Sequence, residues 1–202
     1  MADPLMLYFM NDATRGTEKQ IAPMAFEVRL DAVARGSDAG SGQGSDYFSV
    51  ALVREVTCRN NTRLTLGDTR GLNSCHVRYG DLASWAFPIW RLSTSGLSDG
   101  QTDIDVLENF YTSSCAAANG DNRVCSACAN DGRCDLTDAL AGNDGVIECL
   151  RTQAGDIAFM DNFNAQSADT VVNGQREFRL LCNDGCQEVN DASRVRAPHL
   201  PP

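Results

Sequence analysis

Cationic side chains are scarce in this chain of 202 residues, which has 17 Lys and Arg against 27 Asp and Glu. Its net charge of −10 argues against binding along a nucleic-acid backbone, which needs clustered cations. No apolar run reaches the length of a bilayer span, and residues 1–10 lack the basic start and long apolar stretch of a signal peptide. We therefore expect neither a nucleic-acid partner nor a membrane span in this chain.

Catalytic signatures are missing as well. No Ser-His-Asp set, phosphate-binding loop or paired acid and base emerges from the sequence. Cys75 and His76 are adjacent, but neighbouring residues on a strand point to opposite faces, so they cannot readily act as nucleophile and base. We expect His76 to pack or to make a structural hydrogen bond. The acidic stretch 119–144 lacks the regular spacing of a calcium-binding EF-hand, so we expect a solvated loop there. Because no catalytic signature is present, we expect no enzyme activity.

Cysteine, by contrast, is abundant and odd in number, with nine residues at positions 58, 75, 115, 125, 128, 134, 149, 182 and 186. This usage is typical of an oxidising compartment and predicts an extracellular or cell-surface protein whose amino terminus is missing from this sequence. The sequon Asn60-Asn61-Thr62 agrees, because it predicts glycosylation of Asn60 in a secreted protein. The odd count leaves one thiol without a partner, as in a fragment.

The residue pattern predicts strands and helices in alternation. Strands are expected at 47–53, near 73–77, at 156–160 and at 178–182, and helices at 81–91, 103–111 and 144–153. Asp81 and Asp144 are candidate helix N-caps, and Gly155 is a candidate left-handed terminator. The polar stretch 113–144 holds four cysteines and should be a loop fixed by crosslinks. Such an order indicates an α/β sheet with helices on its faces.

Several motifs, in order and at compatible spacing, make the chain similar to the transferrin family. They are Tyr47-Phe-Ser-Val-Ala-Leu-Val-Arg54, Gly71-Leu-Asn-Ser-Cys-His76, Trp85 with Pro88 and Ile89, Cys149-Leu-Arg-Thr-Gln-Ala-Gly-Asp-Ile-Ala-Phe159, and Phe178-Arg-Leu-Leu-Cys-Asn-Asp-Gly185. The resemblance implies a type II periplasmic-binding-protein-like half-lobe with a mixed sheet, flanking helices and disulfides. In the family, two such domains close on an iron ion and a carbonate.

The resemblance also implies how the chain divides into domains. The segments are a remnant of the first transferrin-like domain at 1–35, the second domain at 47–190 and a carboxyl-terminal return segment at 191–202. The Gly/Ser-rich composition of residues 36–46 separately indicates a linker or surface loop between the first two. The ligand cleft of this fold lies between the two domains, so a fragment has no complete cleft.

Most of the family's iron ligands are altered here. The family holds ferric iron with an Asp, two Tyr and a His, an oxygen-rich set with one imidazole. Tyr47 matches the first tyrosine, but Asn143 stands at the second and Tyr8 at the aspartate. The histidine falls near His199 and Leu200. An isolated Tyr at a strand start is more often a packing or interface residue, so Tyr47 alone is not expected to hold iron.

The anion site is altered in the same direction. In the family a Thr, an Arg and the amides at a helix start hold the carbonate. Val77 replaces the Thr and Asp81 replaces the Arg, while Ala83 and Ser84 keep small side chains. A carboxylate at Asp81 repels an anion and caps the helix itself, so the resemblance implies weakened carbonate binding.

The resemblance pairs Cys75 with Cys149, Cys115 with Cys128 and Cys125 with Cys134. Cys182 with Cys186 is a local guess, which leaves Cys58 over. A structural zinc site at Cys115, Cys125, Cys128 and Cys134 is the rival interpretation, because tetrahedral thiolate sites use Cys-x-x-Cys pairs; the wide, irregular second pair counts against it.

These observations predict a secreted, non-enzymatic transferrin-like binding domain with reduced or lost iron and carbonate binding and a structural or protein-binding role. No cofactor is expected, and the partner would be a protein or cell-surface receptor. The alternative is an iron-transport lobe whose missing ligands lie outside this fragment, which would bind Fe³⁺ with carbonate. An enzyme is the least favoured hypothesis.

Overall fold

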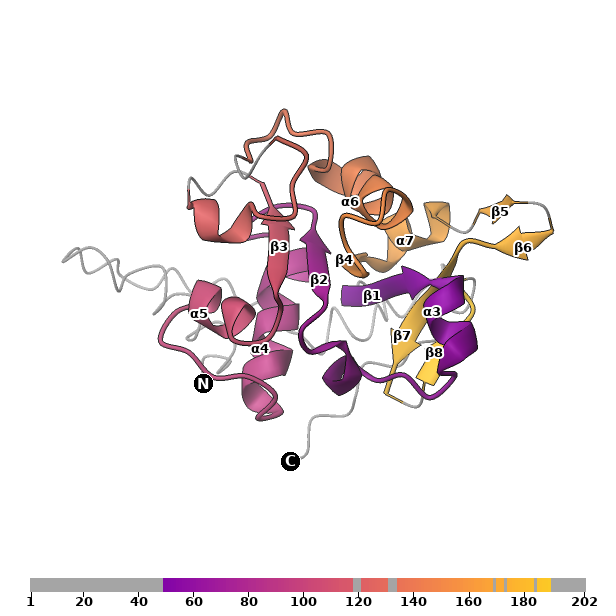
Figure 1. The fold of residues 1–202 in the computed structure, drawn as a ribbon, viewed down its shortest axis with the longest axis horizontal. Coiled ribbons are helices and arrows are strands. Elements are labelled where there is room, and N and C mark those ends of the chain that lie inside the picture. The colour runs from indigo at the N-terminus through magenta and orange to yellow at the C-terminus, as the bar shows by residue number, and fades with distance from the viewer. Residues whose placement is uncertain are drawn as a thin grey trace, which may run out of the picture. The chain divides into compact units, whose positions relative to one another are not determined.

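A computed structural model describes residues 49–117, 121–130, 134–168, 170–172, 174–183 and 185–189 (Figure 1). Tyr8, Tyr47 and His199 lie outside the described residues. The predicted first-domain remnant, the linker and the return segment lie outside them too, so the proposed domain division stays a prediction.

A six-stranded mixed sheet organises the described part of the chain, in the order β3-β2-β4-β1-β7-β8. Its strands are β1 (Ser49–Arg54), β2 (Asn73–His76), β3 (Ser113–Ala116), β4 (Ile157–Asp161), β7 (Phe178–Cys182) and β8 (Gly185–Gln187). The β2 strand runs parallel to β3 and β4, whereas β1 runs antiparallel to β4 and β7. The predicted mixed α/β sheet is confirmed, and it has one strand, β3, inside a stretch expected to be loop.

Helices cover both faces of this sheet (Figure 1). They are α3 (Glu55–Asn60), α4 (Phe87–Thr94), α5 (Asp103–Glu108), α6 (Gly142–Arg151) and α7 (Asn162–Ser167), with a π-helical turn at Leu82–Ala86, 3-10 turns at Leu66–Thr69 and Asn122–Val124, and a small hairpin of β5 (Val171–Val172) and β6 (Gln175–Arg176). Leu52 packs with α6 and α7 on one face. Val53, the next residue, packs with α4 and α5 on the other. This alternation explains why the β1 sequence is apolar on both sides.

The Gly-Asp motif before β4 joins three strands. Asp156 Oδ1 pairs with Arg54 Nη2 at the end of β1, with 3.0 Å between the atoms. Its other oxygen accepts the backbone N–H of Asn73 at the start of β2 at 3.1 Å, and its own N–H donates to the Asn73 carbonyl at 2.8 Å. Since these groups are half-buried and fully bonded, Asp156 fixes the ends of β1, β2 and β4 in register.

Two helix-end predictions were wrong. The N-cap of α6 is Ala141, which makes no side-chain capping hydrogen bond. Asp144 lies in the first turn of α6, where its negative charge interacts favourably with the helix dipole. The chain after α6 turns at Gln153, with a φ of 63°, while Gly155 does not adopt a left-handed conformation. Gly155 is required instead by a close approach to a disulfide: a Cβ there would overlap the sulfur of Cys75.

Candidate functional site

Two helix starts meet the carboxyl end of β2, where the altered anion and metal positions were predicted. Val77 follows β2 directly, and its carbonyl accepts the N–H of Gly142, the first residue of α6, at 2.9 Å. Gly80 turns the chain with a φ of 73°, and Asp81 then begins the helical segment that continues into α4. The structure therefore brings Val77 and the neighbour of Asn143 together, on the edge of the sheet where α/β folds bind ligands.

Asp81 caps its helix as predicted. Its Oδ1 accepts the N–H of Ser84 at 2.8 Å. Its carbonyl accepts the N–H groups of Trp85 and Ala86 at 3.0 and 2.9 Å, which opens the helix as a π turn. Arg78 Nε lies 4.0 Å from Asp81 Oδ2, and both groups face solvent in part, so this ion pair adds little. The carboxylate thus occupies one of the amide donors that an anion at this helix start would use.

Ala83 and Ser84 clamp the same helix start to the sheet. Both residues are buried, at 1% and 0% exposure. The Ala83 carbonyl accepts the hydroxyl of Ser49 on β1 at 2.5 Å, and the Ser84 carbonyl accepts the ring of His76 on β2. Within the described residues, the Ser84 hydroxyl is buried without a hydrogen-bond partner. Their small size is therefore explained by packing between the helix and two strands.

His76 has the structural role that the sequence indicated. It is fully buried, with its Nδ1 donating to the Ser84 carbonyl at 2.5 Å and its Nε2 accepting from the Ser74 hydroxyl at 3.0 Å. The ring stacks on Phe159 and meets Trp85 edge-on, with centroids 5.2 and 5.4 Å apart. Burial lowers the pKa of His76 to about 4, although the Ser84 carbonyl and the Asp81 charge act in the opposite direction. This ring is neutral at physiological pH and has no access to a substrate.

The remaining candidate positions are less constrained. Asn143 is exposed in the first turn of α6, where its neutral amide supplies no anionic oxygen. Asn60 is exposed at the last position of α3, and Asn61 and Thr62 beside it are exposed too, so the sequon is accessible.

Three disulfides are those that the resemblance implies: Cys75–Cys149, Cys115–Cys128 and Cys125–Cys134. The expected Cys182–Cys186 bridge is wrong, because Cys186 is bonded to Cys58. In the β7–β8 hairpin Leu181 is the register partner of Cys186, so these two side chains share one face of the sheet. Cys182 follows Leu181 and points to the other face, against the α6 side of the core. Strand alternation thus separates the two sulfurs.

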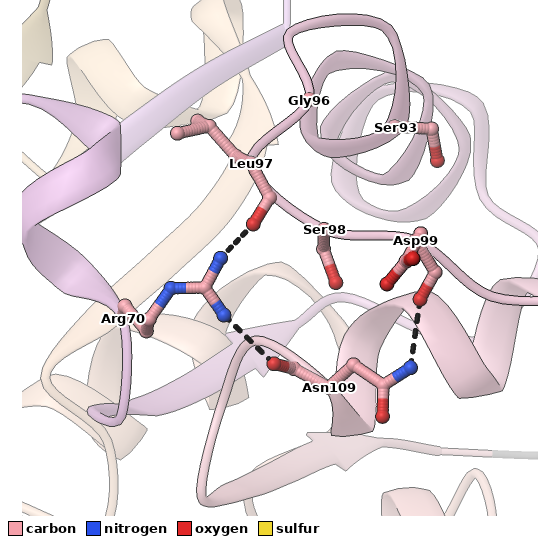
Figure 2. A pocket seen from close by; sticks show the side chains of 7 residues that line it. All are labelled: Arg70, Ser93, Gly96, Leu97, Ser98, Asp99 and Asn109. Carbon is pink, nitrogen blue, oxygen red and sulfur yellow. Dashed lines mark hydrogen bonds between the residues drawn. The ribbon is translucent and has the colours of Figure 1, made fainter.

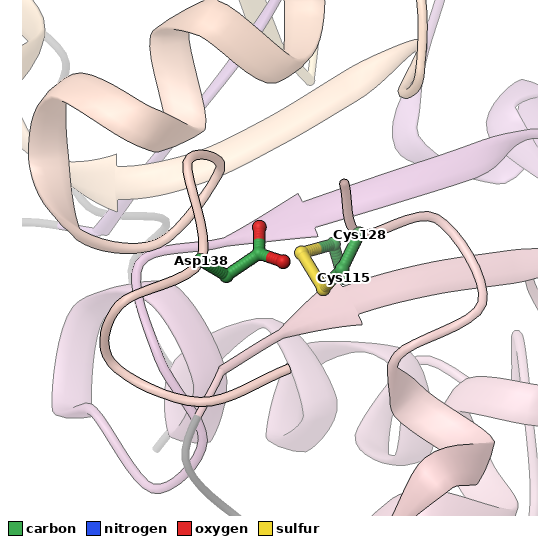
Figure 3. Close-up of side chains that lie close together, drawn as sticks. All are labelled: Cys115, Cys128 and Asp138. Atoms are coloured by element: carbon green, nitrogen blue, oxygen red, sulfur yellow. A yellow bond between two sulfur atoms is a disulfide. The ribbon is translucent and has the colours of Figure 1, made fainter. Parts of the chain in front are cut away.

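The rival zinc hypothesis conflicts with this pairing. A four-thiolate site at Cys115, Cys125, Cys128 and Cys134 needs deprotonated thiols, and all four sulfurs are consumed in disulfides. A carboxylate, Asp138, lies beside the Cys115–Cys128 sulfurs, a neighbour that sequence reasoning missed (Figure 3).

A shallow hollow of about 360 Å³ lies away from these positions (Figure 2). It is lined by Arg70, Ser93, Gly96, Leu97, Ser98, Asp99 and Asn109. The Arg70 guanidinium donates to the carbonyls of Leu97 and Asn109, and it stacks over the Phe110 ring at 4.6 Å. Since the guanidinium donors bond to backbone carbonyls at the wall of the hollow, Arg70 holds that wall in place. No sequence motif marks this hollow.

Comparison with known proteins identifies the family to which the sequence is similar. The sequence model of the family described as Transferrin matches residues 20–199. The chain is 31% identical to serotransferrin of Gadus morhua over 163 residues, which are 77% of this chain and 24% of that protein. It is 28% identical to melanotransferrin of Homo sapiens over 186 residues, 81% of this chain and 25% of that protein. The chain spans about a quarter of the length of these curated relatives.

Among solved structures, transferrin 1 from Manduca sexta superimposes with a TM-score of 0.61 at 21% sequence identity. The match covers 73% of this chain and 27% of that one. At this identity the likeness concerns the fold alone, and it agrees with the mixed sheet and its flanking helices.

Proposed function

This chain belongs to the transferrin family, and from that premise we propose that it is a secreted, non-enzymatic binding domain whose iron and carbonate binding is reduced or lost. One observation carries the proposal. The Asp81 carboxylate accepts the Ser84 N–H at the start of the helix, at the position that the resemblance assigns to the family's anion-binding arginine. The helix therefore meets an approaching anion with a fixed negative charge.

The negative charge at Asp81 weakens carbonate binding in two ways. If the resemblance holds at this position, Asp81 replaces an attractive guanidinium by a repulsive carboxylate. It also holds, through the cap, one amide that the helix would offer to an anion. The side chain of Val77 has no hydrogen-bond donor for the anion. Asn143 has a neutral amide at the position where ferric iron would need a phenolate. Iron held by Tyr47 alone would be weakly and non-specifically bound.

Secretion is supported by the crosslinks. Four disulfides occur within the described residues, and two of them join cysteines 74 and 128 positions apart. Such bridges persist in oxidising compartments. The exposed Asn60 at the end of α3 is available to a glycosyltransferase, so we infer that this residue is glycosylated.

A protein or a cell-surface receptor is the partner class that we propose, in a structural or protein-binding role. The net charge of −10 disfavours nucleic acid. Within the described ranges, no helix combines the length and the hydropathy needed to cross a bilayer.

Titration with ferric nitrilotriacetate in bicarbonate tests the proposal. Tyrosinate bound to ferric iron gives a visible charge-transfer band, and the chain is expected to show no saturable band at one equivalent. Because two altered positions act on different ligands, the double variant Asp81→Arg/Asn143→Tyr should bind iron at least about tenfold more tightly than the original chain, equivalent to about 1.4 kcal/mol.

The matched control is Tyr47→Phe, which removes the retained family tyrosine. A saturable band in the unmodified chain that requires bicarbonate and disappears in Tyr47→Phe would overturn the proposal. It would restore the alternative, an iron-transporting lobe completed by ligands outside this fragment.

A further inference from the structure

A sulfur–carboxylate cluster lies between β3 and the start of α6 and shares no residue with the altered iron positions (Figure 3). Cys115 is on β3, Cys128 follows the 3-10 turn at Asn122–Val124, and Asp138 precedes α6. The two sulfurs and one carboxylate oxygen all lie within 4.8 Å of one another. Figure 3 shows the Asp138 carboxylate directed at the disulfide.

The carboxylate is held in place without help from the sulfurs. Asp138 is 4% exposed. Its Oδ1 accepts the N–H groups of Leu140 at 2.9 Å and Ala129 at 3.3 Å, and its Oδ2 accepts that of Asn130 at 3.2 Å. These bonds fasten the segment just after Cys128 to the loop before α6. The carboxyl group of Asp138 is therefore held beside the sulfurs by backbone donors that do not depend on the redox state of the cysteines.

The two cysteines are also held together by backbone contacts. The N–H of Ala127 donates to the carbonyl of Ser114 at 3.1 Å, so the residues preceding each cysteine are bonded to one another. The Cα atoms of Cys115 and Cys128 are 4.7 Å apart. Breaking the S–S bond therefore leaves both thiols close to Asp138.

We propose that reduction of the Cys115–Cys128 disulfide turns this cluster into a binding site for a thiophilic divalent cation such as Zn²⁺. Two thiolates and the Asp138 carboxylate would be the protein ligands, with water completing a tetrahedron. The proposal concerns other residues and another cation than the altered iron site, and it stands or falls independently of the proposed function.

A dithiol supplies the two electrons. One of its thiolates attacks the Sγ of Cys128, the more exposed residue of the pair, and the sulfur of Cys115, a residue that is 1% exposed, leaves as a thiolate. The second thiol of the reagent then displaces Cys128, so the reagent ends as a disulfide and the protein holds two thiols. Cation binding releases their two protons. The free energy of cation binding then stabilises the reduced cluster.

Exposure favours this bridge over two others. Cys75 and Cys149 are both 0% exposed, and Cys125 and Cys134 are 1% and 8% exposed. In the Cys58–Cys186 bridge the residue Cys186 is partly exposed, so this bridge needs a direct control. Mild reduction should open Cys115–Cys128 before the buried pairs.

Cobalt titration of the full chain tests the site, because Co²⁺ bound by thiolates gives sulfur-to-metal charge-transfer absorption. The oxidised chain is expected to show no such band, and the chain reduced by a dithiol that is then removed should show one that saturates at one equivalent. Zn²⁺ should displace the cobalt. Iodoacetamide labelling of the reduced chain, followed by peptide mapping, should show Cys115 and Cys128 protected when Zn²⁺ is present.

Three variants locate the ligands. Cys115→Ser/Cys128→Ser should abolish the band, and Asp138→Asn should weaken cobalt binding at least about tenfold, or about 1.4 kcal/mol. Asp135→Asn is the matched control, since Asp135 is an exposed carboxylate of the same loop that bonds Thr137, and it should bind as the original chain does. A band that survives the double serine variant, or Zn²⁺ protection falling on other cysteines such as Cys58 and Cys186, overturns the proposal. So does equal weakening by the two aspartate variants. The labelling experiment decides the matter even if a variant fails to fold.

Discussion

Gly155 lies so close to Cys75 that a Cβ added to the glycine would be 2.0 Å from the cysteine sulfur. It would also be 3.1 Å from the sulfur of Cys149, the other half of that bridge. The glycine between α6 and β4 is therefore needed for space beside a buried disulfide, and its φ is not in the left-handed region.

Replacement Gly155→Ala should destabilise the chain by about 3 kcal/mol, because a buried disulfide and backbone cannot move aside for the methyl group. Urea unfolding under nonreducing conditions measures this. Gly67→Ala is the control, since a Cβ there would meet Leu97 at an ordinary 3.4 Å, and its stability should change by less than about 1 kcal/mol. Equal effects of the two substitutions would contradict the packing argument.

Nonreducing peptide mapping of the secreted chain should recover Cys75 linked to Cys149 and Cys58 linked to Cys186. In the chain-entropy account, each of these long loops restricts the unfolded state by about 4 to 5 kcal/mol. Recovery of a Cys182–Cys186 peptide would contradict the strand-alternation argument. Alkylation of Cys75 and Cys149 without prior reduction would contradict both the compartment and the crosslinked fold.

Sequence alone predicted the elements whose residues carry a strong pattern. The β1 strand was recognisable from continuous β-branched and apolar residues, and Asp81 from its place before an apolar helix. The β3 strand was missed because Ser113, Ser114 and their neighbours have little intrinsic preference for strands, and parallel pairing with β2 decides their conformation.

The rest depended on contacts distant in sequence. Cys58 joins Cys186 across 128 positions, and no local spacing reveals this. In the sequence, Asp138 is one of many loop carboxylates. In the structure, three backbone N–H groups donate to its carboxylate and hold it beside a disulfide. The family resemblance predicted three of the disulfides. It did not predict that strand alternation in the β7–β8 hairpin separates Cys182 from Cys186.

Acidification should destabilise the chain through His76. Burial lowers the pKa of this ring to about 4, below the value of about 6.5 for an unfolded histidine. Between these values the unfolded state binds the proton and the folded state does not. The contribution to stability is therefore complete above about pH 6.5 and is lost as the pH falls toward 4, amounting to about 2 kcal/mol between pH 7 and pH 5.

Urea unfolding at pH 7 and pH 5 measures this loss, and His76→Gln should remove most of the difference while lowering stability at both pH values. The sequence has two histidines, so the ring signals can be followed by NMR. The His76 signal should not titrate above about pH 5. Titration of both rings near pH 6.5 would contradict the buried, neutral state.

Substitutions at Asp81 separate its capping role from its charge. Asp81→Ala should lower the free energy of unfolding by about 1 kcal/mol, because the N–H of Ser84 loses its acceptor in a half-buried position. Asp81→Asn keeps a capping oxygen and removes the negative charge, so it should retain most of the stability. Asp81→Arg loses the cap and should be destabilised as Asp81→Ala is, but it places a cation at the helix start. Adding bicarbonate or sulfate should then raise the melting temperature of Asp81→Arg more than that of Asp81→Ala, because only the arginine variant gains an anion site. A higher melting temperature of Asp81→Arg without added anion would show that the carboxylate does not stabilise this helix start.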